Sequence, residues 1–144
     1  MKLAIASDHA GYALKEALKQ AFSEHEFVDF GTHSEDSMDY PDAGYPAALA
    51  VAHAECEMGI LICGSGIGMS ITANKVPGIR AALCYLKDVA ELSRMHNDAN
   101  VLVLAGRFTA EAYAIEIVRA WLSTPFEGGR HQNRLNKIHQ GETK

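Results

Sequence analysis

The residues with the clearest chemical potential lie in one segment, residues 63–68, with the sequence Cys-Gly-Ser-Gly-Ile-Gly. The apolar run 59–62 precedes this segment and a helix-compatible stretch follows it, which predicts a loop between a strand and a helix. Free backbone N–H groups at the amino end of a helix bind anions. The same groups favour a thiolate, so Cys63 could serve as a base or a nucleophile at neutral pH.

A purely structural role also fits this loop, because glycines permit a tight turn and a cysteine that ends an apolar strand is usually buried. The spacing is Gly-x-Gly-x-Gly, and Met69 stands where a dinucleotide-binding fingerprint needs its third glycine. The Gly-Lys-Ser/Thr of a nucleotide-binding loop is missing, so a nucleotide is not the first choice of ligand. Cys56 and Cys84 lack such neighbours, and we expect both in the core.

Asp8 and His9 follow the first expected strand of the chain. Because the carboxyl ends of parallel strands meet at one edge of a sheet, we expect both side chains at the same edge as Cys63. Capping of a helix by Asp8 explains the motif equally well, and Asp8 could do both.

His96 lies between the fourth expected helix and the last expected strand, in a sequence that also favours a surface turn. In right-handed strand–helix units, the carboxyl end of a helix returns to the amino edge of the strands. That edge is opposite the one that holds Cys63. If His96 acts together with Cys63, it comes from a second subunit.

Three arginines are candidates for binding an anionic group. Arg130 and Arg134 are spaced i, i+4, which places them on one helical face and suits a grip on one phosphate. Arg107 follows the last expected strand and could add a third cation at the edge of Cys63. A solvated basic face and the capping of surface carbonyls are the alternatives.

The elements that must position these residues alternate along the chain, which predicts strand–helix units around a parallel sheet. The tail after Thr124 fits a last helix that lies over the surface. Expected strands are 2–7, 26–30, 58–63, 80–84 and 101–105. One apolar helical face runs from Leu14 to Phe22, and a second helix begins near Pro41-Asp42 and turns Ala47, Ala48, Val51 and Ala52 toward the sheet. Further helices fit 66–75, 87–95 and 109–122.

Composition limits the function classes. With 144 residues, 48% of them hydrophobic, the chain has the size and core of one domain. Its net charge of −5 is scattered, which argues against nucleic acid or a membrane as a partner. Neither a signal peptide nor a run of transmembrane length is apparent. Three cysteines without Cys-x-x-Cys spacing argue against disulfides and structural zinc, so we expect a cytoplasmic protein.

Five segments in order together resemble type B ribose-5-phosphate isomerase, nearly from end to end: Asp8-His9, 39–42, 63–75, 96–101 and 128–132. The resemblance implies an α/β fold, a flavodoxin-like or Rossmann-like three-layer α/β/α sandwich with a five-stranded parallel sheet. It implies one domain, 1–144, whose tail, 125–144, carries phosphate-binding arginines. It also implies a homodimer or tetramer with shared active sites, and neither metal nor cofactor.

By this resemblance, Cys63 is the base that moves a proton between C1 and C2 of an open-chain phosphosugar. The loop amides and Ser65 stabilise the enediolate. His96 is the acid that opens the furanose ring, and Asp8 acts beside the sugar hydroxyls. Substrate-binding residues by the same resemblance are His9, Tyr40, Gly64, Gly66, Ile67, Gly68, Asn97, Arg107, Arg130 and Arg134.

Two positions depart from the pattern: Ser65 replaces the threonine of many members, and Met69 replaces the catalytic glutamate of one branch. Serine keeps the hydroxyl, whereas methionine cannot act as a base.

Galactose-6-phosphate isomerase subunits depart from the pattern His96-Asn97-Asp98, so the pentose is favoured, but allose 6-phosphate and galactose 6-phosphate stay open as substrates. A non-catalytic phosphosugar-binding module is the alternative of another class. A flavin- or nucleotide-dependent enzyme should carry a phosphate loop after its first strand, where this chain has Asp8-His9.

Overall fold

A computed structural model describes residues 1–143 and contains a five-stranded parallel sheet. The strands are β1 (Lys2–Ser7), β2 (Glu26–Asp29), β3 (Met58–Cys63), β4 (Ala81–Leu83) and β5 (Val101–Ala105), in the order β2-β1-β3-β5-β4. The five expected strands are confirmed, with β2 and β4 slightly shorter than expected. The backbone N–H groups of Phe30 and Cys84 still bond to the neighbouring strands, so only the ends of the ladders differ.

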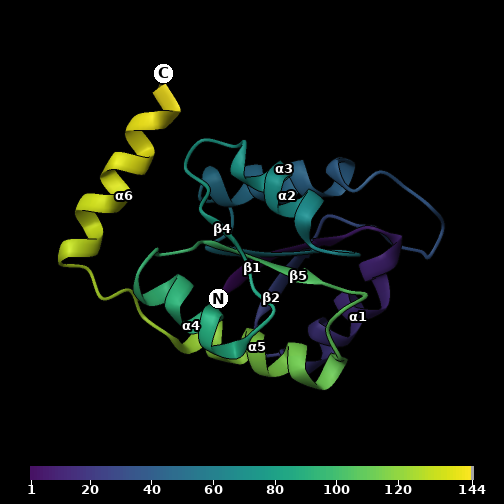
Figure 1. The fold of residues 1–144 in the computed structure, drawn as a ribbon. Helices are drawn as coiled ribbons and strands as arrows, with labels where there is room; N and C mark the ends of the chain where they lie inside the picture. The colour runs from purple at the N-terminus through teal and green to yellow at the C-terminus, as the bar shows by residue number, and fades with distance from the viewer. Residues whose placement is uncertain (144) are drawn as a thin grey trace.

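Helices cover both faces of the sheet and confirm the three-layer α/β/α arrangement (Figure 1). On one face lie α2 (Pro41–Ala52) and α3 (Ile67–Asn74), and on the other lie α1 (Tyr12–Ala21), α4 (Lys87–Met95) and α5 (Glu111–Ser123). Side chains alternate along each strand, so one core packs many alanines of β1 and α2 while the other packs larger residues. Within residues 1–143, no helix has both the length and the hydropathy to cross a membrane.

The topology creates a crevice at the carboxyl edge of the sheet. From β1 the chain passes through α1 on one face to β2, whereas from β3 it passes through α3 on the other face to β4. β1 and β3 are neighbours, so their carboxyl ends flank a switch point, where open α/β sheets bind ligands. Compared with the flavodoxin order 2-1-3-4-5, the last two strands are exchanged.

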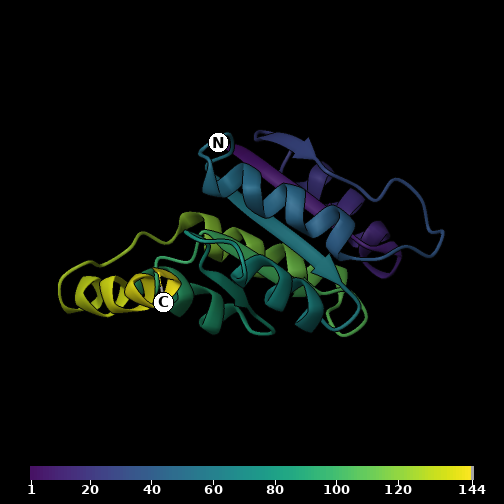
Figure 2. The same cartoon turned by 90° about the horizontal axis from the view of Figure 1, so that it is seen from above.

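The tail forms a helix, α6 (Arg130–Gln140), followed by the 3₁₀ turn η2 (Gly141–Thr143). Figures 1 and 2 show α6 projecting from the side of the three layers. It is anchored by the buried side chains of His131 and Leu135 and by a hydrogen bond of 3.0 Å between Arg80 Nη1 and His139 Nε2. Lys144, the last residue of the predicted tail, lies outside the described residues.

Candidate active site

An open pocket of about 490 Å³ lies at the carboxyl edge of the sheet, at the switch point. Segments that are far apart in the sequence meet there: the end of β1, the start of α2, the loop before α3 and the end of β5. The structure thus places Asp8 and Arg107 beside Cys63, at the edge where they were expected. The lining residues are Asp8, Tyr40, Cys63, Gly64, Ser65, Ile67, Gly68, Ile71, Arg107 and Phe108.

Cys63 is the last residue of β3, and its carbonyl accepts a hydrogen bond of 2.8 Å from the N–H of Gly106. It differs from the other two cysteines because its side chain lines the pocket. Cys56 and Cys84 are buried in the two cores, as expected. Burial raises the pKa of Cys56, and it raises the pKa of Cys84 to about 11. Only Cys63 therefore combines a thiol with a ligand-sized opening.

The loop before α3 is held in a fixed shape. Gly66 precedes α3 with φ at 80°, a conformation that suits glycine. Ser65 accepts a hydrogen bond at Oγ from the N–H of Ile67 (3.2 Å) and another at its carbonyl from the hydroxyl of Tyr85 (2.8 Å). The N–H groups of α3 that follow Ile67 in the first turn have no acceptor within the helix. Such groups can bind an anion, so the anion-binding role of this loop stays a prediction.

Two glycines let other side chains close over this loop. At Gly68 the phenol ring of Tyr40 occupies the space that a side chain would need. At Gly64 a β-carbon would lie 3.2 Å from Nη1 of Arg107. Tyr40 and Arg107 therefore approach the backbone of the loop from two sides of the pocket.

Asp8 fulfils the capping role that was considered for it, because its Oδ1 accepts a hydrogen bond of 3.1 Å from the N–H of Gly11. It also lines the pocket, although only 7% of its surface is exposed. His9 lies in the adjoining 3₁₀ turn, η1 (His9–Gly11), and its Nδ1 accepts a hydrogen bond from the N–H of Met38 (3.3 Å). This bond ties the start of η1 to the segment that leads to Tyr40.

His96 and Asn97 lie at the opposite, amino edge of the sheet. His96 caps the carboxyl end of α4, and the carbonyl of Asn100 accepts a hydrogen bond from Gly59 at the amino end of β3. Along β3, the residues from Gly59 to Cys63 cover about 13 Å, at about 3.3 Å for each residue step. A single chain therefore keeps His96 and Cys63 apart. This separation was predicted from the handedness of the strand–helix crossovers. Arg130 and Arg134 are exposed on α6, away from the lining of the pocket.

A cluster at this amino edge contains two residues that we did not single out individually from the sequence. The imidazole of His96 stacks on that of His131, with ring centroids 4.3 Å apart and planes at 14°. His131 Nε2 lies 3.4 Å from Glu127 Oε2, and His131 is buried. The i, i+4 spacing of Glu127 and His131 is the only sequence signal for this pair.

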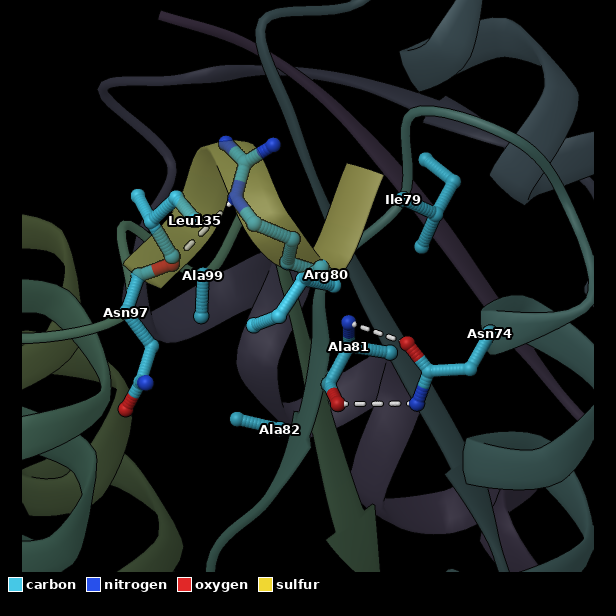
Figure 3. A pocket seen from close by; sticks show the side chains of 9 residues that line it. Asn74, Ile79, Arg80, Ala81, Ala82, Asn97, Ala99 and Leu135 are labelled. Carbon is cyan, nitrogen blue, oxygen red and sulfur yellow. Dashed lines mark hydrogen bonds between the residues drawn. The ribbon is translucent and has the colours of Figure 1, made fainter. Parts of the chain in front are cut away.

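Two arginines brace the loop that carries His96 and Asn97. Arg94 Nη1 donates to Asp98 Oδ1 (2.9 Å) and to the carbonyl of Ala99 (2.6 Å). Arg80 Nε donates to the carbonyls of Asn97 (3.2 Å) and Asp98 (2.9 Å). Figure 3 shows Arg80 reaching toward Asn97 at a mainly apolar pocket of about 270 Å³, which Leu135 and Ile138 of α6 help to line. Arg94 and Asp98 have the i, i+4 spacing of a local ion pair, whereas no such spacing links Arg80, which lies 17 residues before Asn97.

Comparisons with known proteins agree over nearly the whole chain. The sequence model of one family, Ribose/Galactose Isomerase, matches residues 3–138. Ribose-5-phosphate isomerase B of Escherichia coli is 47% identical over 95% of this chain and 93% of its own length. A solved ribose-5-phosphate isomerase B of Clostridium thermocellum has 50% identity and a TM-score of 0.98, covering 99% of this chain and 98% of the other. The corresponding protein of Mycoplasma genitalium, solved with bound ribulose 5-phosphate, has 41% identity and a TM-score of 0.95, covering 99% and 97%.

Proposed function

Because the chain belongs to the ribose/galactose isomerase family, we propose that it is an aldose–ketose isomerase that interconverts ribose 5-phosphate and ribulose 5-phosphate. This reaction belongs to the pentose phosphate pathway. The observation that carries the proposal is the pocket at the carboxyl edge, where Cys63, the amino end of α3 and Arg107 meet. These are a base, an anion-stabilising backbone and a cation for a phosphosugar.

In the proposed reaction, the thiolate of Cys63 takes the proton from C2 of the open-chain aldose. The electron pair of that C–H bond forms the C1–C2 double bond, and the carbonyl oxygen at C1 becomes an oxyanion. Backbone N–H groups of residues 64–68 and the hydroxyl of Ser65 stabilise this enediolate. The thiol then returns the proton to C1 while the hydroxyl proton moves from O2 to O1, which gives the ketose without a net change in protons.

The active site is completed by a second copy of the chain in this proposal. His96, Asn97, Arg130 and Arg134 belong to the amino edge or to α6, so a two-fold dimer would bring these groups of one copy to the Cys63 pocket of the other. Large apolar side chains at the pocket are unusually exposed, as an interface requires: Ile67 (54%), Ile71 (58%) and Phe108 (74%). A tetramer would follow from pairing two such dimers.

Within this shared site, His96 protonates the ring oxygen of the furanose and so opens it. Asn97, Asp8, His9 and Tyr40 contact sugar oxygens. Arg107 from the pocket, together with Arg130 and Arg134 from α6, binds the phosphate. The arginines at i, i+4 supply two charge-assisted donors on one face of α6.

The remaining parts of the proposal concern organisation and location. The chain acts as one domain, 1–144, whose tail, 125–144, carries two of the phosphate-binding arginines. We place it in the cytoplasm, since its three cysteines are free thiols and its relatives carry the names of metabolic enzymes.

The test is a substrate panel with the purified protein in EDTA. Ribose 5-phosphate, allose 6-phosphate and galactose 6-phosphate are each incubated with the enzyme, and the ketose product is measured by chromatography. We expect rapid formation of ribulose 5-phosphate and slow turnover of the six-carbon phosphates. Preferential turnover of a six-carbon phosphate would contradict the substrate assignment, and binding without turnover of any of the three would favour the non-catalytic module.

A further inference from the structure

A second group of reactive side chains lies outside the pocket, at the amino edge. Among residues 1–143, His96, Glu127 and His131 form the group that could hold a metal ion, because their ligand atoms all lie within 4.8 Å of one another. They come from three places in the chain: the end of α4, the segment after α5 and the first turn of α6. The docking of the tail therefore creates the group.

The ligand set matches one class of ion. Two imidazoles and a carboxylate are a common three-residue set for Zn²⁺, which takes its fourth ligand from water or substrate. We propose that His96, Glu127 and His131 bind Zn²⁺ or a similar transition-metal ion, and that the bound ion inhibits the enzyme. The inhibition rests on the proposed function, because it requires His96 to act on the sugar, whereas the binding does not.

The geometry needs only a limited adjustment. Tetrahedral zinc with bonds of about 2.1 Å separates its ligand atoms by about 3.4 Å, and His131 and Glu127 already stand 3.4 Å apart. His131 is 5% exposed and is held in place, whereas His96 is only half-buried at the end of α4. The ring of His96 lies in a stack and must rotate out of it so that both imidazoles direct a nitrogen at one ion.

The charges around the group also suit a cation. Glu127 supplies the negative charge, and Asp98 is occupied by Arg94 and Arg80, so those arginines are paired. Arg130 is the next cation along the chain, but it is exposed, and solvent screens its charge. A metal bound to His96 would take the imidazole lone pair, and His96 could then no longer exchange a proton with the ring oxygen.

Metal binding is tested first without substrate. The metal-free protein is titrated with Zn²⁺ in competition with a chromophoric chelator, and with Co²⁺ followed by its visible absorption. We expect one equivalent of ion for each chain and the intense d–d bands of a tetrahedral site. An absorption band from cysteine thiolate to cobalt would place the ion at a cysteine and overturn the proposal.

Two matched variants identify the ligands. Glu127→Gln removes the carboxylate and should weaken Zn²⁺ binding at least tenfold, with little change in the activity of the metal-free enzyme. Glu24→Gln is the control, because Glu24 Oε1 stands 3.7 Å from His25 Nε2 in a surface pair that belongs to no such three-residue group in the described part of the chain. This control should leave binding unchanged. Equal affinity in the wild type and Glu127→Gln would overturn the assignment.

Turnover of ribose 5-phosphate is measured last. Activity should fall with the same midpoint as Zn²⁺ binding and return fully with EDTA, and Glu127→Gln should shift both midpoints together. Full activity with the site loaded would overturn the inhibitory part of the proposal. If the wild type binds Zn²⁺ through Glu127 yet turns over no sugar phosphate without metal, the metal site stands and the proposed function fails.

Discussion

The Cys63 pocket and the His96 cluster lie at opposite edges of one sheet, and different parts of the chain build them. Backbone dominates the pocket: strand ends converge there, and glycines let Tyr40 and Arg107 approach the loop. Side chains dominate the cluster, where Arg80 and Arg94 brace a loop and a helix of the tail supplies His131.

This difference suggests a division of labour. A pocket made of backbone amides has fixed dipoles at the position where negative charge would develop, which suits stabilisation of an enediolate. A titratable side chain on a braced loop suits proton transfer, and the arginines of α6 suit phosphate binding. Neither region holds all the groups that the proposed reaction needs, so the comparison can be tested by disabling each region separately.

The largest effect is expected from Cys63→Ala. Loss of the base should lower kcat by about a thousandfold, within the range of general-base catalysis, while binding of ribose 5-phosphate changes little. Turnover and exchange of the C2 proton with solvent are measured, with ligand binding by calorimetry. Cys56→Ala is the matched control, since this thiol is equally buried but lies in the core. An active Cys63→Ala enzyme would refute the role of the pocket.

Mixing two inactive variants tests whether the regions act across subunits. In a dimer formed from one Cys63→Ala chain and one His96→Ala chain, one site carries both substitutions and the other carries neither. Random exchange of subunits makes half of the dimers mixed, so activity should return to about a quarter of the wild-type value. The mixture is unfolded, refolded and assayed beside each variant refolded alone. Absence of recovery would mean that Cys63 and His96 do not share a site between copies.

The sequence permits prediction of the pocket far better than of the cluster. Strand ends meet at one edge of any parallel sheet, so Asp8 and Arg107 could be placed beside Cys63 from their positions after β1 and β5. The same topology predicted that His96 would lie at the far edge. The stack of His96 on His131 could not be predicted, because it depends on where a tail helix docks across many residues.

The apolar cores and the arginines that brace the His96 loop differ in the same way in how well the sequence predicts them. Leu14 and Leu18 follow the helical period and are buried, as their spacing predicted. Arg94 also faces inward on α4, but a buried arginine gives no periodic signal. Its ion pair with Asp98 has local i, i+4 spacing, but the carbonyl of Thr124 that accepts a hydrogen bond of 3.3 Å from its Nε lies 30 residues away and is brought there only by tertiary structure. Local patterns therefore predict elements, and long-range polar contacts escape them.

A smaller effect is expected from Asp98→Asn, which weakens the brace of the His96 loop. Asparagine keeps the shape and tolerates the positive φ of 45° at this position, but both ion pairs are lost. The Asp98 side chain is 35% exposed, so the unfolding free energy should fall by only about 0.5–1 kcal/mol. We expect kcat to fall about tenfold, since a misplacement of about 1 Å is enough for such a loss.

The readout that separates positioning from general damage is the rate at which iodoacetamide alkylates Cys63. This rate reports on the pocket and should not change in Asp98→Asn. The control is Asp88→Asn, which removes the same charge from the exposed first turn of α4 and should leave kcat unaltered. A parallel loss of alkylation rate and kcat would show that the two edges are not independent.

The smallest effect concerns acid stability between α1 and β2, where Lys15 and Lys19 pair with Asp29 and Glu16. Hydrogen bonding from Lys15 is the main cause that lowers the pKa of Glu16. At Asp29, burial opposes this effect, but the two lysines outweigh it and lower the pKa. Asp29 also accepts a hydrogen bond from the N–H of Gly31, at the start of the segment that leads to the pocket.

Because both carboxyl groups have a lower pKa in the folded chain, the unfolded chain binds protons first, near pH 4. The contribution of these two ionised carboxyl groups to the unfolding free energy is complete above that pH. It is lost as the pH falls through their pKa values in the folded chain. Glu16→Gln removes one of these carboxyl groups. The unfolding free energy of the variant should therefore depend less on pH between pH 5 and 3 than that of the wild type. The difference from the wild type should be below about 1 kcal/mol, because the Glu16 side chain is 39% exposed. Urea unfolding at both pH values, followed by the fluorescence of Trp121, measures it. An identical pH dependence in both proteins would mean that the ion pairs of Glu16 do not contribute to the stability of the folded chain.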